Sequence, residues 1–272
     1  NPETTSLWSD SIDGQSSVNG GAVAHISPSG QNRFSIPKRH LSKNTTITQS
    51  SYLLQVDNPV FTNADLGVDT DQLRQHLLKW AGGMDIYDID DDKISEETRQ
   101  SLGDQLNQKP HVVSYFNGSS SNPVVFTGSN EGYLHAFDAA DGEHLYSFMP
   151  YEFLKNIQLM DRTNDSKVYG LDGALFSHEI NTQSASAKNM LFFGFGRGGQ
   201  SFYALDITNR TQPQYAWSIN NQVSGFQRLG LTLSQAAVGT LKLNEADSKD
   251  IIVLSGGLDP NEPVSRDQQL GN

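Results

Sequence analysis

The sequence predicts an all-β fold, namely a partial β-propeller made of four-stranded blades with a few short inserted helices. Turn-forming Gly, Ser, Asn and Asp interrupt the chain every few residues, and the runs between them are short and rich in Val, Ile, Phe or Tyr. One pair of strands also recurs along the chain as an internal repeat. The 272 residues are enough for one large domain of this kind.

We expect residues 1–272 to form a single incomplete propeller domain. Residues 1–110 would hold leading strands with a helical and acidic-loop insertion, and residues 111–272 would hold successive blade repeats, the last of them truncated. The expected strands share short apolar runs bounded by turn residues; they cover 111–116, 123–128, 133–137, 190–194, 202–205, 214–219 and 251–254.

Helical periodicity occurs in three places. Residues 70–81 place apolar side chains on one face, between a capping Asp or Thr and a terminating Gly82. Residues 95–106 open with Ser-Glu-Glu, which favours a helix N-terminus. Residues 151–160 repeat apolar positions at helical spacing after a proline. We predict short helices at all three, inserted between strands.

The internal repeat is the most informative pattern. Residues 132–148 align with residues 200–217: each has a strand, an Ala-apolar-Asp triplet, a turn, and a second strand ending in an aromatic residue. A third apolar strand, at 251–257, begins a further copy. Such units cannot bury both faces alone, so they typically stack as blades of a propeller. A sandwich with similar hairpins is the alternative.

The triplets have a physical interpretation. The carboxylates of Asp138 and Asp206 can accept hydrogen bonds from backbone amides two or more residues on, which would fix the tight turn between outer strands. The small side chains of Ala136 and Ala204 would leave room where neighbouring sheets approach.

Composition excludes several classes. With 19 Lys and Arg against 31 Asp and Glu, the net charge is −12, which disfavours a nucleic-acid partner because phosphates would be repelled. Cysteine is absent, so disulfides, thiolate nucleophiles and cysteine zinc sites are excluded. No apolar stretch approaches the roughly 18 residues of a membrane span. An export signal either is lacking or lies outside the sequence.

Several segments carry a family resemblance. Thr-Gly-Ser-Asn-Glu-Gly-Tyr-Leu-His-Ala-Phe-Asp at 127–138 is the most specific, and it is supported by 141–154, 169–173, 196–208, 229–230 and 254–257. The chain resembles the propeller domain of PilC/PilY-type type IV pilus biogenesis factors and tip-associated adhesins, and covers the N-terminal portion of that C-terminal domain. It departs from the family pattern at 105–108, at 231–234 and at Leu258.

The resemblance implies a function and partners. It implies a non-enzymatic protein of pilus assembly and cell adhesion, exported through the periplasm and outer membrane to the pilus tip or cell surface. Minor pilins would be its partners, with host-cell or surface receptors as further ligands. The remainder of the propeller would come from the same parent chain.

One acidic run has metal-ligand spacing. Its side chains and one carbonyl occupy positions 1, 3, 5, 7 and 9 of an EF-hand-like loop, an arrangement of hard oxygen ligands that Ca²⁺ prefers. The five candidates are Asp88, Asp90, Asp92, the carbonyl of Ile94, and Glu96. Calcium is the only cofactor that we predict.

Two residues oppose the calcium interpretation. Lys93 occupies the position where Gly normally allows the sharp turn, and Arg99 stands where the bidentate Glu would be. A solvated acidic loop therefore stays open as the alternative.

Other motifs favour structural roles. Gly-Phe-Gly-Arg-Gly-Gly at 194–199 matches a dinucleotide fingerprint in letters, but the following residues read as a strand, so we interpret it as a hairpin. His135 lies among apolar neighbours and is expected to be a hydrogen-bonded structural residue. No nucleophile elbow or zinc motif is present.

Two other functions stay open. The repeats also look like those of pyrroloquinoline-quinone dehydrogenase propellers, whose quinone needs a Ca²⁺ ion, an Asp base and stacking tryptophans. Only Trp8, Trp80 and Trp217 are available for stacking. A generic outer-membrane assembly scaffold is the third hypothesis.

Overall fold

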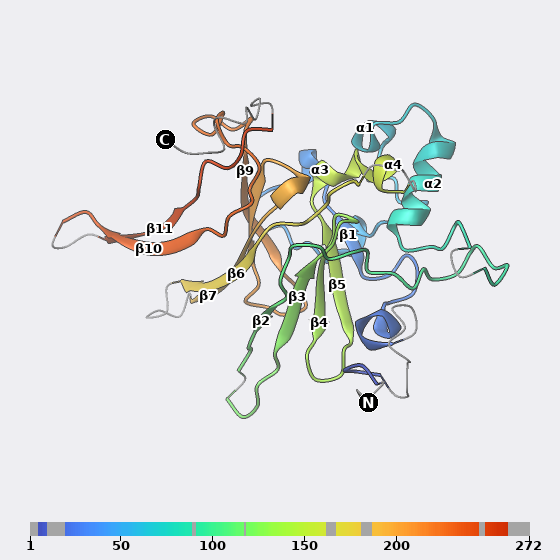
Figure 1. The fold of residues 1–272 in the computed structure, drawn as a ribbon, viewed down its shortest axis with the longest axis horizontal. Coiled ribbons are helices and arrows are strands. Elements are labelled where there is room, and N and C mark those ends of the chain that lie inside the picture. Colours follow the sequence, from blue (N-terminus) through green and yellow to red (C-terminus); the bar gives the residue numbers. More distant parts are fainter. Residues whose placement is uncertain are drawn as a thin grey trace, which may run out of the picture.

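A computed structural model of the chain describes residues 5–9, 20–88, 91–116, 118–161, 167–180, 187–244 and 248–260. Strands make up most of the regular structure, and the α-helices within these ranges are short and gather at one end of the sheets (Figure 1). The described strands form a five-stranded sheet, a four-stranded sheet and a two-stranded hairpin. The all-β prediction is confirmed, and the sheets formed by the described strands do not close into a ring.

The first sheet contains one blade-like meander and one added strand. Its order is β1-β5-β4-β3-β2, in which β2 to β5 are antiparallel neighbours and β1 runs parallel to β5. The strands are β1 (Arg33–Ser35), β2 (His111–Val113), β3 (Val124–Gly128), β4 (Leu134–Asp138) and β5 (His144–Met149).

The second sheet repeats the meander with four antiparallel strands. They are β6 (Leu175–Ile180), β7 (Lys188–Gly194), β8 (Ser201–Asp206) and β9 (Gln214–Asn220), followed by a hairpin of β10 (Ala237–Lys242) and β11 (Ser248–Val253). Strands β1, β6 and β10 were not predicted. In both meanders the pairing of the last two strands shifts register directly after the buried alanine, Ala136 in one and Ala204 in the other. The two meanders predicted as a sequence repeat thus share even this register shift.

The two turn aspartates behave as predicted. Asp138 Oδ1 accepts a hydrogen bond from the amide of Ala140 at 2.9 Å, and Asp206 Oδ1 accepts one from the amide of Thr208 at 3.1 Å. Each carboxylate also pairs with a cation, because Asp138 contacts Arg210 and Asp206 contacts a lysine. These local bonds fix the turn between the outer strands of each meander.

The main core lies between the two meanders. The rings of Phe148 on β5 and Tyr203 on β8 lie 6.4 Å apart, and Phe193 stacks on Tyr203 at 5.5 Å. At the inner strands, His111 Nε2 and Ser177 Oγ lie 2.9 Å apart across β2 and β6. The meanders therefore pack on each other as consecutive blades would.

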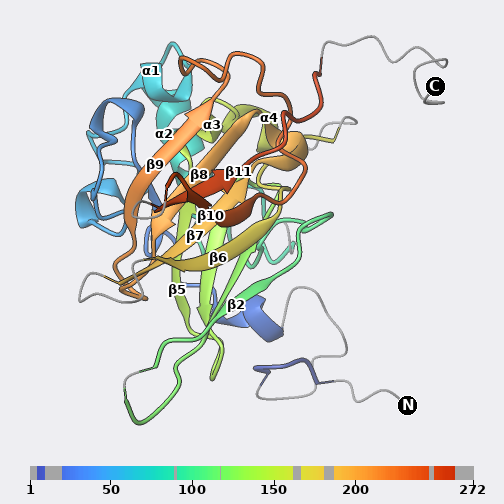
Figure 2. The same ribbon diagram turned by 90° about the vertical axis from the view of Figure 1, so that its left-hand side faces the viewer.

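A second core lies under the hairpin. Buried Phe176, Phe192 and Phe202 form the floor of this cluster on the second sheet, and Val238 and Ile252 of the hairpin pack against it. Figure 2 shows β10 and β11 crossing in front of β7 and β8. The hairpin thus lies on the sheet as a third layer, where the sequence predicts a further copy to begin.

The leading segment covers the outer edges of both sheets. Strand β1 pairs with β5, so that Phe34 faces Phe148. Further along, the amide of Asn44 donates to the carbonyl of Tyr215, and the amide of Tyr215 donates to the carbonyl of Thr45, each at 2.8 Å. An uncovered edge strand leaves its backbone N–H and C=O groups unpaired. The leading segment supplies partners for these groups on β5 and β9.

The helices match two of the three predictions. They are α1 (Asn63–Leu66), α2 (Asp71–Ala81), α3 (Tyr151–Leu154) and α4 (Ile157–Met160), with 3₁₀ turns η1 (Gly21–His25), η2 (Lys38–His40), η3 (Ser50–Tyr52) and η4 (Gly196–Gly198). The hydroxyl of Thr70 caps α2 by accepting from the amide of Leu73. None of the helices in the described part of the chain is long and apolar enough to cross a membrane.

The helix predicted at 95–106 is wrong. This segment is irregular, with bends and no helical turn, and Thr98 forms an isolated bridge with Met84. Its Arg99 is only 3% exposed and is paired with Glu131, a residue far away in sequence. A buried ion pair with a distant partner outweighs the weak helical preference of Ser-Glu-Glu.

The glycine-rich segment is a hairpin, as predicted. Strand β7 ends at Gly194, η4 makes the turn, and β8 begins at Ser201. Its backbone lies directly against the segment before β6: a Cβ on Gly198 would lie 1.8 Å from the carbonyl oxygen of Gly170. Only glycine fits at such a close approach.

We predict that Gly198→Ala lowers the free energy of unfolding by about 1–3 kcal/mol, because the new methyl group would push apart two backbone segments. Urea denaturation of the purified chain measures the change. Gly239→Ala is the matched control, since a Cβ there meets no atom within 4 Å, and it should change stability by no more than about 0.5 kcal/mol. Equal effects of the two substitutions would contradict the close approach.

Candidate functional site at the acidic loop

The acidic run forms a closed loop that leaves the body of the protein after α2. Met84 and Thr98 pair at its base, and the amide of Asp85 donates to the carbonyl of Glu97 at 2.9 Å. The loop therefore starts and ends at the same place, which is the geometry that a short ion-binding loop needs.

Two of the predicted ligands hold the loop's own backbone. Asp88 Oδ1 accepts a hydrogen bond from the amide of Lys93 at 3.0 Å, and Asp92 Oδ1 accepts one from the amide of Ile94 at 2.8 Å. A carboxylate has two oxygens, so each of these side chains can still accept from a further partner. The spacing that predicted calcium thus also serves Asx-type turns.

The other three predicted ligands give the calcium site no direct support. Glu96 pairs with Lys79 on α2 at 2.9 Å, and the lysine lowers the pKa of this exposed carboxyl. Asp90 lies outside the described residues, and Ile94 is exposed. Calcium at Asp88, Asp90, Asp92, Ile94 and Glu96 therefore stays a prediction.

The structure places the two opposing residues differently. Lys93 has a backbone φ of 74°, so it adopts the left-handed conformation that glycine would take at this position of an EF-hand loop. Arg99, by contrast, turns into the protein and contributes nothing to the loop's outer face. Lys93 is thus a strained stand-in for glycine, whereas Arg99 is a structural anchor.

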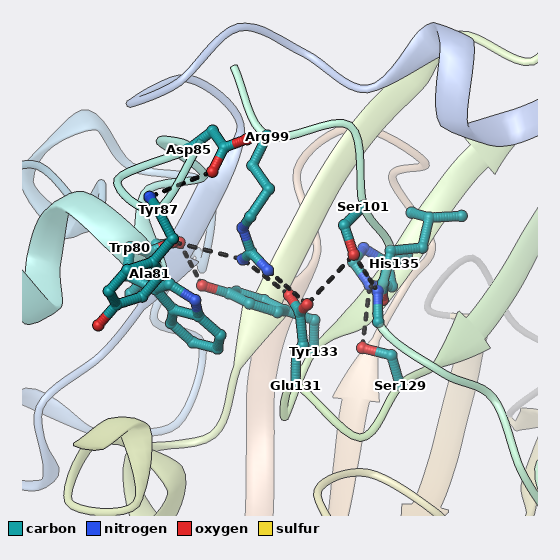
Figure 3. Close-up of polar contacts among 12 residues, drawn as sticks. Trp80, Ala81, Asp85, Tyr87, Arg99, Ser101, Ser129, Glu131, Tyr133 and His135 are labelled. Atoms are coloured by element: carbon teal, nitrogen blue, oxygen red, sulfur yellow. Dashed lines mark hydrogen bonds and ion pairs between the residues drawn. The ribbon is translucent and has the colours of Figure 1, made fainter. Parts of the chain in front are cut away.

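Arg99 anchors the base of the loop through a buried polar cluster (Figure 3). Its guanidinium donates to both carboxylate oxygens of Glu131, with Nη2 to Oε2 at 2.8 Å, and lies 4.4 Å above the ring of Trp80. Burial opposes the charged form, but the Glu131 carboxylate outweighs it and raises the pKa of Arg99. Ser101 donates to the same carboxylate at 3.3 Å. Removing either charge would leave the other buried without a partner.

A second arginine lies deeper in the same region. Arg33 on β1 is 2% exposed, and its Nε and Nη1 have no hydrogen-bond partner within the described part of the chain. Its guanidinium lies 5.9 Å from the centre of the Tyr133 ring, and burial lowers its pKa. Sequence reasoning did not single out Arg33 and gave Arg99 no buried role, because nothing local distinguishes an arginine that turns inward.

His135 belongs to a chain of hydrogen bonds that crosses the first sheet. The amide of Ser27 donates to Nδ1 of His144 at 3.2 Å, so Nε2 of that ring carries the proton and donates to Ser147 Oγ at 2.7 Å. The hydroxyl of Ser147 then donates to Nδ1 of His135 at 2.6 Å, and Nε2 of His135 donates to the carbonyl of Leu102 at 3.2 Å. The prediction of a hydrogen-bonded structural histidine is confirmed.

Both histidines of this chain are held neutral. Burial lowers the pKa of His144 to about 3, and burial together with the neighbouring His144 lowers that of His135 well below the ordinary value. An added proton on His144 would also set an N–H against the donating amide of Ser27. This series of hydrogen bonds therefore joins the leading segment to β5 and β4 only while both histidines are uncharged.

A further acidic group is formed by Asp138, Asp141 and Glu143, whose carboxylate oxygens lie within 4.8 Å of one another. It was not predicted as a metal site. Asp138 already pairs with Arg210, and Asp141 accepts the amide of Glu143. These interactions account for the turn, and we assign no metal to it.

Comparisons with known proteins agree with the resemblance. No family model matches the chain. A type IV pilus biogenesis factor PilY1 homolog of Xylella fastidiosa is 30% identical over 163 residues, which cover 55% of this chain and 13% of the relative. Type IV pilus biogenesis factor PilY1 of Pseudomonas aeruginosa is 26% identical over 122 residues, which cover 44% of this chain and 10% of the relative. The curated homologues are PilY1 factors.

One solved structure is also similar. The crystal structure of the Pseudomonas aeruginosa PilY1 C-terminal domain aligns with a TM-score of 0.37 and 24% identity, over 50% of this chain and 25% of that one. The resemblance to PilC/PilY-type factors is confirmed by the sequence matches. This chain spans only a small part of the length of the curated PilY1 relatives that it matches.

We predict that Asp90→Ala together with Asp92→Ala abolishes stabilisation of the chain by Ca²⁺, measured as the shift in Tm between EDTA and millimolar CaCl₂. Lys93→Gly should increase that shift, because it relieves the left-handed residue and restores the EF-hand pattern. A Glu143→Ala and Glu179→Ala double variant has the same net charge as the first variant and should keep the wild-type shift. If wild type shows no shift, the loop is only an acidic turn.

The histidine chain predicts a pH dependence of stability. Because the folded pKa of His144, about 3, lies below the unfolded value of 6.5, the unfolded state binds more protons between these pH values. Stability should be fully present above pH 6.5 and fall on acidification, by up to about 1.4 kcal/mol per pH unit for each such histidine.

Denaturant titrations of wild type, His144→Gln and His178→Gln from pH 7 to pH 4 measure this dependence. His144→Gln should have the shallower slope, because it removes one of the two buried titrating groups. His178 is exposed, so its variant should keep the wild-type slope. Equal slopes for all three proteins would show that the buried histidines do not govern acid stability.

Proposed function

We propose that this chain is the leading part of a propeller in a type IV pilus biogenesis factor, which acts by binding other proteins and performs no catalysis. The observation that carries the proposal is the PilY1 match over 55% of the chain. The homologues' names support a role connected with type IV pili. Export to the pilus tip or cell surface, and adhesion there, belong to the same proposal.

The polar groups support a non-enzymatic role. Ser147 lies between two histidines, which superficially resembles a nucleophile beside its base. However, Ser147 is fully buried, and His135 and His144 are only 1% and 2% exposed. No substrate could reach this serine without opening the first sheet, so the constellation fits a structural hydrogen-bond chain.

The tryptophans argue against the quinoprotein alternative. Trp80 is buried beneath Arg99, and Trp217 packs beside Phe192 and Phe202 at 6.0 and 6.3 Å. Trp8 lies against Phe137 and donates its indole N–H to a backbone carbonyl. Each ring is thus engaged with this chain's own residues, which argues against a set of rings arranged to stack on a quinone.

We propose that further blades of the same parent chain pack against the hairpin side of the molecule. Large apolar side chains there are half exposed, and this supports such a contact. They are Leu241, Leu243, Val253 and Leu258, with exposed fractions of 47%, 49%, 57% and 50%. Minor pilins would then bind the assembled propeller, with host-cell or surface receptors as additional ligands.

We predict that minor pilins co-purify with the intact parent protein and are lost when residues 111–260 are deleted from it. Surface pili recovered by shearing should fall in the same strain. A parent carrying Gly239→Ala, which alters an uncrowded position, is the control and should behave as wild type. Unchanged pilin recovery and piliation would contradict the proposal, and a quinone in acid extracts of the pure protein would favour the dehydrogenase alternative.

A further inference from the structure

A cavity of about 450 Å³ lies where the two sheets meet the helical end of the molecule. Residues of α3 and the two positions after it form one wall. The other wall comes from the turn between β7 and β8, the first residue of β8, the last residue of β9 and the two positions after β9. The leading segment closes it with Lys38 of η2 and with residues of α1, and α1 lies near α3 in Figure 1. Its volume is in the range of small-molecule sites, roughly 300–1,000 Å³.

Glu152 on α3 is the most constrained polar group in this cavity. Its carboxylate accepts from the hydroxyl of Tyr203 at 2.6 Å and from that of Ser201 at 3.1 Å. Both donors are neutral, and no lysine or arginine pairs with Glu152 within the described part of the chain. Burial raises the pKa of this carboxyl. The result is a fixed acceptor, and a carboxylate, with about four lone-pair sites, has capacity beyond these two bonds.

The opposite wall presents carboxamides in fixed positions. Asn221 donates to Gln200 Oε1 at 2.9 Å, and Gln200 donates in turn to the carbonyl of Leu229 at 3.0 Å. Asn220 donates to the hydroxyl of Tyr151 at 3.4 Å. Because each carboxamide has two donor hydrogens and an acceptor oxygen, all three keep unused capacity after these bonds.

The charges of the lining nearly cancel. Lys38 lies 5.6 Å from the centre of the Tyr151 ring, on the rim of the cavity, and Glu152 supplies the opposite sign. Lys155 and Asp65 also line the cavity, and Asp65 is already paired with Arg39. An anion would meet the Glu152 carboxylate, and an apolar ligand would leave the amides unpaired at a cost. A neutral ligand rich in hydroxyl groups matches, since each hydroxyl both donates and accepts.

We propose that this cavity binds a neutral saccharide, with Glu152 accepting from ring hydroxyls and with Gln200, Asn220 and Asn221 forming the opposing polar wall. The site is independent of the pilus role, because it uses none of the surface proposed above for further blades. The saccharide could be a free sugar or the end of a glycan. The two sources share the same chemistry at the cavity.

The test begins with the full chain on an array of neutral mono- and oligosaccharides, followed by calorimetric titration of the best ligand. A free monosaccharide as the best ligand would assign a soluble sugar, and a preference for chain-terminal units would assign a glycan. Glu152→Gln keeps the side-chain shape and removes the charge, and it should weaken binding by about tenfold or more. Glu143→Gln, an exposed acid remote from the cavity, should bind as wild type.

A second variant guards against a folding effect at Glu152. Lys38 is exposed on the rim and forms no ion pair within the described residues, so Lys38→Met should fold normally and bind the sugar more weakly than wild type. Failure to bind any neutral saccharide would overturn the proposal. Saccharide binding that neither variant changes would also overturn it. Selective, Glu152-dependent binding of lysine-bearing peptides would overturn it too, because the cavity would then be a cation site.

Discussion

The structure depends on the segment before β6, which lies close enough for backbone to touch backbone at the ends of both sheets. A Cβ on Gly170 of this segment would lie 2.5 Å from the amide nitrogen of Gly132, which precedes β4. Gly198 and Gly170 meet where a methyl group on Gly198 would lie 1.8 Å from an oxygen. Between the ends, Ala136 and Ala204 are fully buried at the positions where each meander shifts register. Glycine and alanine at these points let Phe148 and the aromatic residues of the second sheet fill the space between the sheets. The same small residues therefore account for both the close approach and the packing of the core.

Covering the outer edges follows from this arrangement. Two meanders stacked by their faces would each expose an edge strand, and the leading segment pairs with both, through β1 on β5 and through Thr45 on β9. The same segment brings Lys38 to the rim of the cavity and Ser27 to the buried histidine chain. A segment that completes the sheets therefore also places the chemistry at their ends, which explains why residues far apart in sequence meet there.

The sequence predicted correctly those features that depend on interactions between residues close together in the chain. The turns at Asp138 and Asp206 need only amides two residues on, and they were predicted correctly. The helix at 95–106 failed because Arg99 pairs with Glu131, 32 positions away, and local preference cannot anticipate that partner. In the acidic loop, spacing gave the candidate ligands, but the same carboxylates also serve the loop's own turns. Glu152 was not singled out at all, because its donors Ser201 and Tyr203 come from the other sheet.

The polar groups of this chain divide by whether their hydrogen-bonding capacity is used up internally. In the buried chain from Ser27 to Leu102, every ring nitrogen has a partner, and burial keeps both rings uncharged, so nothing is left to bind a ligand. Glu152 differs because it lines a cavity, and the Ser201 and Tyr203 hydroxyls that donate to it carry no charge to balance its own. A partly buried carboxylate without a cationic partner is costly to keep, and a bound hydroxyl-rich ligand would offset that cost with additional hydrogen bonds. Placing such a group at the junction of two blades ties its geometry to the packing of the sheets, so any ligand held there would also hold the blades together.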